Sequence, residues 1–162
     1  PKAMHPEFGA VVQAECDRTG RELTANEVYE LFQREFLNIS EPYALSRAKF
    51  YEEAIAGSAA NVTHFSGVLS VRGQFMQLES RGNGPIDAFF NALGQAGIEG
   101  YSFISYSEHA ISMGSDSQAV AYIELRVPGG RRIFGVGTEH NINFASVKGI
   151  LSAINRFESG MA

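Results

Sequence analysis

The sequence predicts an α+β fold made of two βββα units, preceded by a small subdomain of two helices. Apolar residues recur at helical spacing over the first 37 residues and alternate with period two in much of the remainder. One succession of strands, glycine-containing turns and a helix also occurs twice. We therefore expect the helical subdomain at 1–40 and the α+β domain at 41–162, with repeats at 43–97 and 101–157.

The first 37 residues predict a pair of helices. The first helix begins near Pro6, which suits a first helical turn, and ends at Gly20, which can take the left-handed conformation. The second begins with a capping box formed by Thr24 and Glu27. One face of each helix is apolar: Phe8, Val11, Val12 and Cys16 in the first, and Val28, Leu31, Phe32 and Phe36 in the second. Two short helices bury too little surface to be stable alone, so we expect the pair to dock on another element.

The first repeat is predicted from residues 61–72 and 74–81, which alternate as a hairpin around a one-glycine turn at Gly73. The glycine-rich bend Gly82-Asn83-Gly84-Pro85 follows and leads into a helix that Gly97 closes. The apolar face of this helix carries Ile86, Phe89, Phe90 and Leu93.

The second repeat is predicted from strands at 101–110, 118–127 and 131–137, with a turn at Gly129-Gly130. A second glycine-rich bend, Gly135-Val136-Gly137, is expected before the last helix, whose apolar face carries Phe144, Val147, Leu151 and Ile154. Because the strand at 101–110 opens this repeat, symmetry predicts a strand at 43–52, although the composition there also suits a helix. Helices on one face of a mostly antiparallel sheet would complete the fold.

Composition and charge exclude several classes of protein. The net charge of -5 gives no reason to expect nucleic acid or an anionic membrane as a partner, and no apolar run reaches the length of a membrane span. A single cysteine, Cys16, and the lack of a basic–apolar leader indicate a cytoplasmic protein. The start at Pro1, without an initiator methionine, indicates a piece of a longer polypeptide.

The glycine-rich bends are candidate anion sites, because a helix that starts at a glycine offers free backbone N–H groups and the positive end of its dipole. A tight strand-to-helix turn that binds nothing uses the same residues, so both interpretations stay open. Neither bend completes a dinucleotide-binding fingerprint.

The sequence gives little support for a catalytic site or a metal site. Tyr106, Glu108 and His109 could act as acid–base groups, but neighbours on a strand point to opposite faces, and a polar strand end is the simpler interpretation. The four histidines, His5, His64, His109 and His140, have no metal-ligand spacing. The loop at 112–118 is either a connector or a lid over a ligand.

Several strings occur together in one order: Gly82-Asn83-Gly84-Pro85-Ile86-Asp87-Ala88, Tyr106-Ser107-Glu108-His109-Ala110, Asp116-Ser117-Gln118-Ala119, Phe134-Gly135-Val136-Gly137 and Ser152-Ala153-Ile154-Asn155-Arg156. Together they resemble the C-terminal regulatory domain of the 2-isopropylmalate synthase family, and the helical pair resembles its linker subdomain. The resemblance covers essentially the whole chain. It implies a duplicated βββα regulatory domain that forms a homodimer and binds leucine as a feedback inhibitor near the dimer interface.

The residues that match the family's effector pocket are Gly82, Asn83, Gly84, Ile86, Phe103, Tyr106, Ala110, Ser117, Ala119 and Ile142. Helix starts after Gly84 and near Asn141 can receive the effector carboxylate, and backbone carbonyls or Asp116 can take its ammonium group. Ile86, Ala110, Ala119 and Ile142 can bound its side chain. The resemblance also implies a catalytic barrel upstream in the same polypeptide, which holds a divalent metal, the 2-oxo acid and acetyl-CoA. We expect no catalytic residue, metal or cofactor in this chain.

Three alternatives remain. The same fold could sense isoleucine in a citramalate synthase, since one methyl placement is worth only about 1–3 kcal/mol. The chain could instead be a hydrolase or lyase that uses Tyr106, Glu108 and His109, or a dimerisation module without a ligand.

Overall fold

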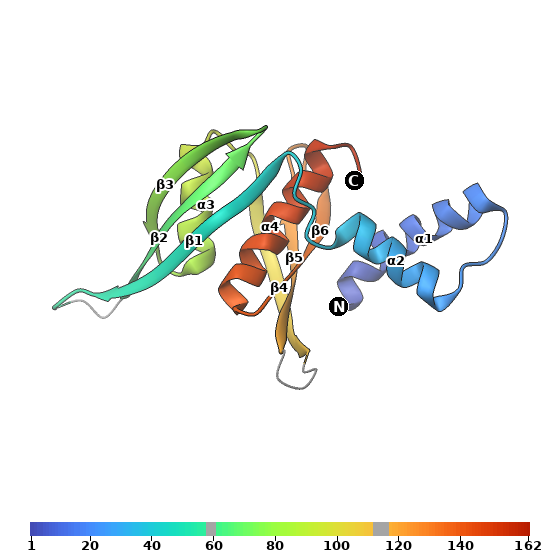
Figure 1. Ribbon diagram of the computed structural model, residues 1–162, viewed down its shortest axis with the longest axis horizontal. Coiled ribbons are helices and arrows are strands. Elements are labelled where there is room, and N and C mark those ends of the chain that lie inside the picture. The colour runs from blue at the N-terminus through green and yellow to red at the C-terminus, as the bar shows by residue number, and fades with distance from the viewer. Residues whose placement is uncertain (58–60, 112–116) are drawn as a thin grey trace.

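The computed structural model describes residues 1–57, 61–111 and 117–162. The elements in chain order are a 3₁₀ turn (Lys2–Met4), α1 (His5–Thr19), α2 (Ala25–Phe36), β1 (Tyr43–Ala54), β2 (Asn61–Val71), β3 (Gln74–Gly82), α3 (Pro85–Gln95), β4 (Ser102–Ile111), β5 (Gln118–Arg126), β6 (Arg132–Glu139) and α4 (Ile142–Glu158). The predicted α+β class with two βββα units is confirmed (Figure 1).

The strands form two separate antiparallel sheets, β1-β2-β3 and β4-β5-β6, where the sequence suggested one. Helix α3 packs on β2 and β3, and α4 packs on β5 and β6. Because α4 also contacts β1 and α3, it lies between the two units, as Figure 1 shows. One continuous apolar core therefore joins both repeats.

The duplication extends to an irregularity in the first strand of each repeat. The pairing of β1 with β2 shifts between Leu45 and Arg47, and that of β4 with β5 shifts between Phe103 and Ser105. An extra residue of this kind is a β-bulge, which bends a strand and re-aims its side chains. The shared bulge fixes which positions of the two repeats are equivalent.

The strand that symmetry predicted at 43–52 is confirmed, since β1 pairs with β2 from Tyr43 to Ala54. Pairing with a neighbour therefore outweighs the helical composition of this segment. The hairpin turn has two residues rather than one, Arg72 and Gly73, at φ 51° and 85°. Such a pair of positive φ values matches the right-handed twist of the flanking strands. Gly97 follows α3 at φ 77°, as expected for a residue that ends a helix.

The second glycine-rich bend was predicted wrongly. Gly135 and Gly137 lie inside β6, and the bend before α4 is formed by residues 140–141. A Cβ at either glycine would overlap the backbone of α4, and a Cβ at Gly149 of α4 would lie 2.7 Å from Cγ1 of Ile123. These glycines therefore let the helix and the sheet approach closely. In the sequence, glycines with this packing role look the same as glycines that form a turn.

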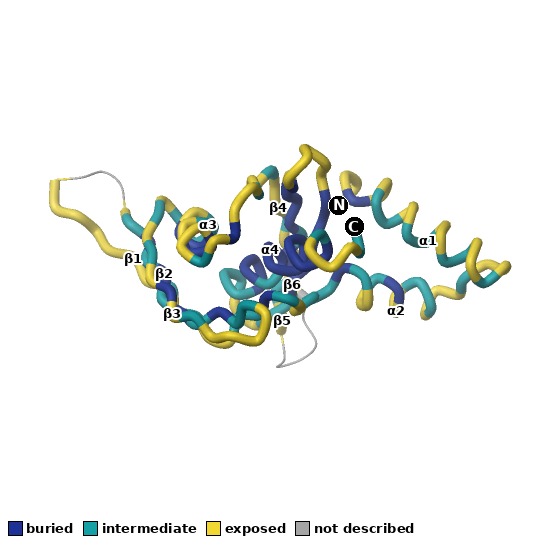
Figure 2. The backbone as a smooth tube through the Cα atoms, turned by 90° about the horizontal axis from the view of Figure 1, so that it is seen from above, coloured by how far each residue is buried: buried dark blue, intermediate teal, exposed yellow. Residues whose placement is uncertain are grey.

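The helical pair docks on the outer face of the second sheet. Phe8, Phe32 and Phe36 contact one another at ring-centroid distances of 5.7–6.0 Å. They pack against an apolar cluster of Met4, Val120, Phe134 and Val136. The predicted capping box of α2 is present, with the N–H of Glu27 donating to Thr24 Oγ1 at 3.2 Å. Much of α1 remains exposed, as Figure 2 shows.

Two polar side chains of α4 hold the segment that joins the helical pair to β1. The hydroxyl of Ser152 donates to the carbonyl of Phe36 at 2.6 Å and accepts from the N–H of Ile39 at 3.1 Å. The amide of Asn155 donates to the carbonyls of Ile39 and Tyr43, both at 2.7 Å. It also accepts from the N–H of Tyr43 at 2.9 Å. These hydrogen bonds, which are buried or part-buried, fix the path of the chain between α2 and β1.

A buried ion pair connects α1 to α4. The side chain of Arg156 is 1% exposed, and its Nη1 donates to Glu7 and, at 2.5 Å, to the carbonyl of Phe134. The other oxygen of Glu7 accepts from the N–H of Phe134 at 2.9 Å. The guanidinium lies 3.7 Å from the ring centroid of Phe36. Burial lowers the pKa of Arg156, and the Glu7 carboxylate opposes that shift.

Candidate functional site

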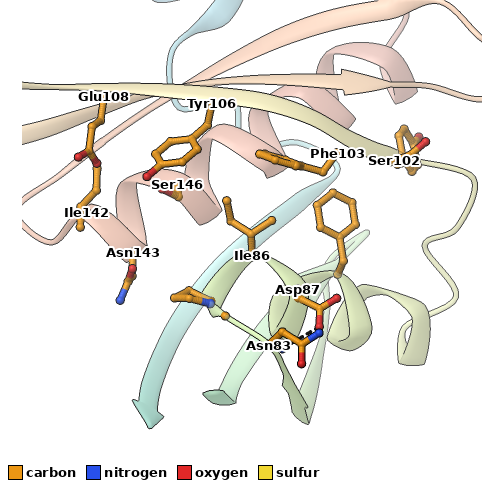
Figure 3. A pocket seen from close by; sticks show the side chains of 14 residues that line it. Asn83, Ile86, Asp87, Ser102, Phe103, Tyr106, Glu108, Ile142, Asn143 and Ser146 are labelled. Carbon is orange, nitrogen blue, oxygen red and sulfur yellow. Dashed lines mark hydrogen bonds between the residues drawn. The ribbon is translucent and has the colours of Figure 1, made fainter. Parts of the chain in front are cut away.

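A cavity of about 820 Å³ lies where the start of α3 faces β4 and the first turn of α4 (Figure 3). Its lining residues are Asn83, Gly84, Pro85, Ile86, Asp87, Phe90, Tyr101, Ser102, Phe103, Tyr106, Glu108, Ile142, Asn143 and Ser146. We call this space the main cavity. Its walls therefore come from both repeats, and its size suits a small molecule.

The bend between β3 and α3 places the helix start against the main cavity. A Cβ at Gly82 would lie 2.5 Å from Oδ2 of Asp87 and 2.6 Å from the N atom of Ala88. Only glycine therefore lets the end of β3 pass this close to the first helical turn. Gly82 was predicted in the pocket, but it is not among the residues that line the main cavity. It lies against the first turn of α3 and supports the bend.

The two helix starts that the sequence suggested as anion sites differ. The carboxamide oxygen of Asn141 accepts from the N–H groups of Asn143, at 2.8 Å, and Phe144, at 3.3 Å, so α4 caps itself. Gly84 caps α3 without a side chain. Within the described residues, the N–H groups of Ile86 and Asp87 therefore have no side-chain cap, and the α3 start is the better anion site.

Strand β4 supplies the aromatic wall of the main cavity. Phe103 and Tyr106 are 38% and 48% exposed, with ring centroids 6.5 Å apart, and Figure 3 shows both rings on the side of β4 that faces Ile86. Tyr101 lines the same space, and its hydroxyl donates to Glu158 at 2.6 Å. Burial and this hydrogen bond raise the pKa of Tyr101, so its hydroxyl stays protonated.

A second, smaller cavity of about 350 Å³ adjoins the main cavity. It is lined by Glu108, His109, Ala110, Ser117, Gln118, Ala119, His140 and Ile142. Glu108 and Ile142 line both spaces. The smaller cavity lies where β4 ends and β5 begins.

The predicted site residues thus divide between the two cavities. Asn83, Gly84, Ile86, Phe103, Tyr106 and Ile142 line the main cavity, whereas Ala110, Ser117, Ala119 and, again, Ile142 line the smaller one. Asp116 and the rest of the loop at 112–116 lie outside the described residues.

Sequence reasoning missed several lining residues. Phe90 follows Ile86 at helical spacing and Ser146 follows Ile142 in the same way, so periodicity could have indicated both. Tyr101 and Ser102 could not be found in this way, because only the fold brings the start of β4 to α3.

The structure gives the acid–base alternative only partial support. Glu108 and His109 both line the smaller cavity, but the carboxylate of Glu108 also reaches into the main cavity, and the ring of His109 packs against Tyr122 with centroids 5.5 Å apart. Among the described residues, no three His, Cys, Asp or Glu side chains gather as a metal site would require. No described helix is both long enough and apolar enough to span a membrane.

Comparison with known proteins adds an independent observation. A family model described as the LeuA allosteric (dimerisation) domain matches residues 22–158. The chain is 41% identical over 156 residues to a 2-isopropylmalate synthase of Clostridium acetobutylicum, covering 96% of the chain and 28% of the relative. It is 42% identical over 159 residues to one of Pseudomonas fluorescens, covering 96% of the chain and 27% of the relative.

A 2-isopropylmalate synthase of Pseudomonas entomophila is 41% identical over 164 residues, which cover 96% of the chain and 26% of the relative. The chain therefore spans roughly a quarter of the length of each of these three relatives. The family model, in contrast, matches most of the chain, including both repeats and the second helix of the pair. The chain belongs to the LeuA allosteric (dimerisation) domain family.

Proposed function

We propose that the chain is the regulatory domain of a 2-isopropylmalate synthase and binds leucine in the main cavity as a feedback inhibitor. The observation that carries the proposal is an apolar cavity at an uncapped helix start in a domain of an allosteric family. The parent enzyme condenses acetyl-CoA with 2-oxoisovalerate in a separate catalytic barrel, which holds the divalent metal. The chain itself carries out no condensation, and the protein works in the cytoplasm.

The chemistry of the main cavity supports an amino acid as ligand. Its lining contains no lysine, arginine or histidine among the described residues, so backbone N–H groups at the start of α3 are left to bind a carboxylate. Ile86, Phe90 and Phe103 offer apolar contacts to a branched side chain. The smaller cavity gives the ligand side chain further room past Ile142.

The domain is proposed to act as a homodimer, in line with the description of its family. Strand β4 is the edge of its sheet and exposes Phe103 and Tyr106, which a second copy would cover. An effector held near the interface then favours one arrangement of the subunits over another and shifts the population accordingly. Sedimentation should report a dimer, and a monomer at high concentration would contradict this part of the proposal.

Replacing Gly84 with aspartate tests the carboxylate site. Gly84 has an extended backbone at φ -178°, and an added Cβ would meet nothing within 4 Å, so the side chain fits. The carboxylate of an N-cap aspartate accepts hydrogen bonds from the first free N–H groups of the helix, so we expect the substitution not to destabilise the fold. We expect leucine affinity to fall at least about ten-fold in titration calorimetry, because the donors are occupied and the new carboxylate repels the effector.

Gly84→Ala is the matched control, since it adds a Cβ without a charge or an acceptor. It should keep more of the wild-type leucine affinity than Gly84→Asp does. A folded Gly84→Asp variant that keeps wild-type leucine affinity would place the effector elsewhere.

A further inference from the structure

The two repeats meet at two equivalent junctions, in each of which the first strand of one repeat faces the helix of the other. Phe50 of β1 and Glu108 of β4 are equivalent, because each lies four residues beyond the bulge and pairs with the corresponding position of the next strand. Phe144 of α4 and Asp87 of α3 are equivalent too, because each lies three residues after its N-cap.

The first junction is closed by aromatic side chains. The rings of Phe50 and Phe144 lie 6.3 Å apart, and Phe50 also packs against Phe65 at 5.2 Å. At the second junction the equivalent residues are Glu108 and Asp87, and the space between strand and helix is the main cavity. The same architecture therefore fills one junction with two rings and lines the other with two carboxylates.

The two carboxylates are not equally available. Oδ2 of Asp87 accepts from the N–H of Asn83 at 2.8 Å, so this side chain already serves the bend before α3. Glu108 is exposed, and the described residues offer it no hydrogen bond or ion pair. Figure 3 shows its carboxylate reaching from β4 into the cavity beside Ile142. Among the described residues that line the main cavity there is no lysine, arginine or histidine, so the carboxylate of Glu108 is available to a positively charged group of a ligand.

We propose that Glu108 binds the α-ammonium group of the effector, so that the cavity accepts an α-amino acid and rejects the corresponding 2-oxo acid. This inference rests on the proposed function. A zwitterion carries both groups that the lining can bind, a carboxylate for the N–H groups at the α3 start and an ammonium group for Glu108. The 2-oxo acid has no ammonium group and brings a net negative charge next to two carboxylates.

The test compares L-leucine with 4-methyl-2-oxopentanoate, its 2-oxo acid, by titration calorimetry of the 162-residue chain. The wild-type chain should bind leucine at least about ten-fold more tightly than the 2-oxo acid, as expected for a charge-assisted hydrogen bond. Glu108→Gln keeps the shape and removes the charge. It should weaken leucine binding about ten-fold or more and leave 2-oxo acid binding unchanged or tighter.

Glu52→Gln is the matched control, because Glu52 is an exposed glutamate on β1 that does not line the cavity. It should bind both ligands as the wild type does. If Glu108→Gln keeps the wild-type leucine affinity, the inference is overturned and the proposed function stands. An equal loss of affinity for leucine and for the 2-oxo acid would also overturn the inference alone. A wild-type chain that binds no leucine would overturn the proposed function and the inference with it.

Discussion

Replacing Gly137 with valine is expected to lower the free energy of unfolding of the chain by about 3 kcal/mol or more. Gly137 lies in β6, where α4 crosses the sheet, and a Cβ there would overlap the backbone of Ala145 and Gly149. A side chain could rotate away, but helix backbone cannot, so α4 has to move off the sheet. Urea denaturation followed by circular dichroism measures the loss.

Gly9→Ala provides a control of opposite sign. Gly9 lies within α1, and an added Cβ would meet nothing within 4 Å. Alanine there should stabilise the chain by about 0.5–1 kcal/mol, because it reduces the entropy of the unfolded state without a clash. Unfolding of Gly137→Val at the wild-type urea concentration would show that α4 does not pack on β6 as described.

The second large effect is expected from Arg156→Ala, which should destabilise the chain by about 3 kcal/mol. The change leaves Glu7 without its cationic partner and removes the guanidinium that covers the ring of Phe36. It also removes the hydrogen bond to the carbonyl of Phe134. A buried ion pair adds little net stability, but breaking one by removing a single partner strands the other charge. Urea denaturation again reports the change.

Arg132→Ala is the matched control, since Arg132 is exposed on β6 and the described residues give it no ion pair. Its unfolding midpoint should remain that of the wild type. If Arg156→Ala and Arg132→Ala unfolded at the same urea concentration, the Glu7–Arg156 pair would not hold the helical pair to α4.

Periodicity and repetition predicted most of the fold. The strand β1 is the clearest case, because its local composition suits a helix and only the second repeat indicated a strand. Gly135 and Gly137 show the limit of this reasoning. A glycine that permits a turn and one that permits close helix packing look alike in a sequence, and the choice depends on what lies opposite in space.

The sequence predicted several of the residues that line the site, but not that they are distributed over two cavities. Resemblance to a family supplied ten candidate residues, and the fold distributes nine of them over two adjoining cavities, with Gly82 supporting the bend beneath. From the sequence, the starts of α3 and α4 were equally good candidates for an anion site. The difference depends on the orientation of the Asn141 side chain, which caps α4. The proposed role of Glu108 in binding the ammonium group follows only from comparing the two junctions, and that comparison needs the register of the strands.

Titration calorimetry of the chain with leucine, isoleucine and valine tests most directly whether this domain senses leucine. We expect saturable binding of leucine, with isoleucine at least several-fold weaker, because the placement of one methyl group is worth about 1–3 kcal/mol in an apolar pocket. Tighter binding of isoleucine would contradict the assignment of leucine. The absence of binding heat with all three amino acids would contradict the sensor itself and leave a dimerisation module.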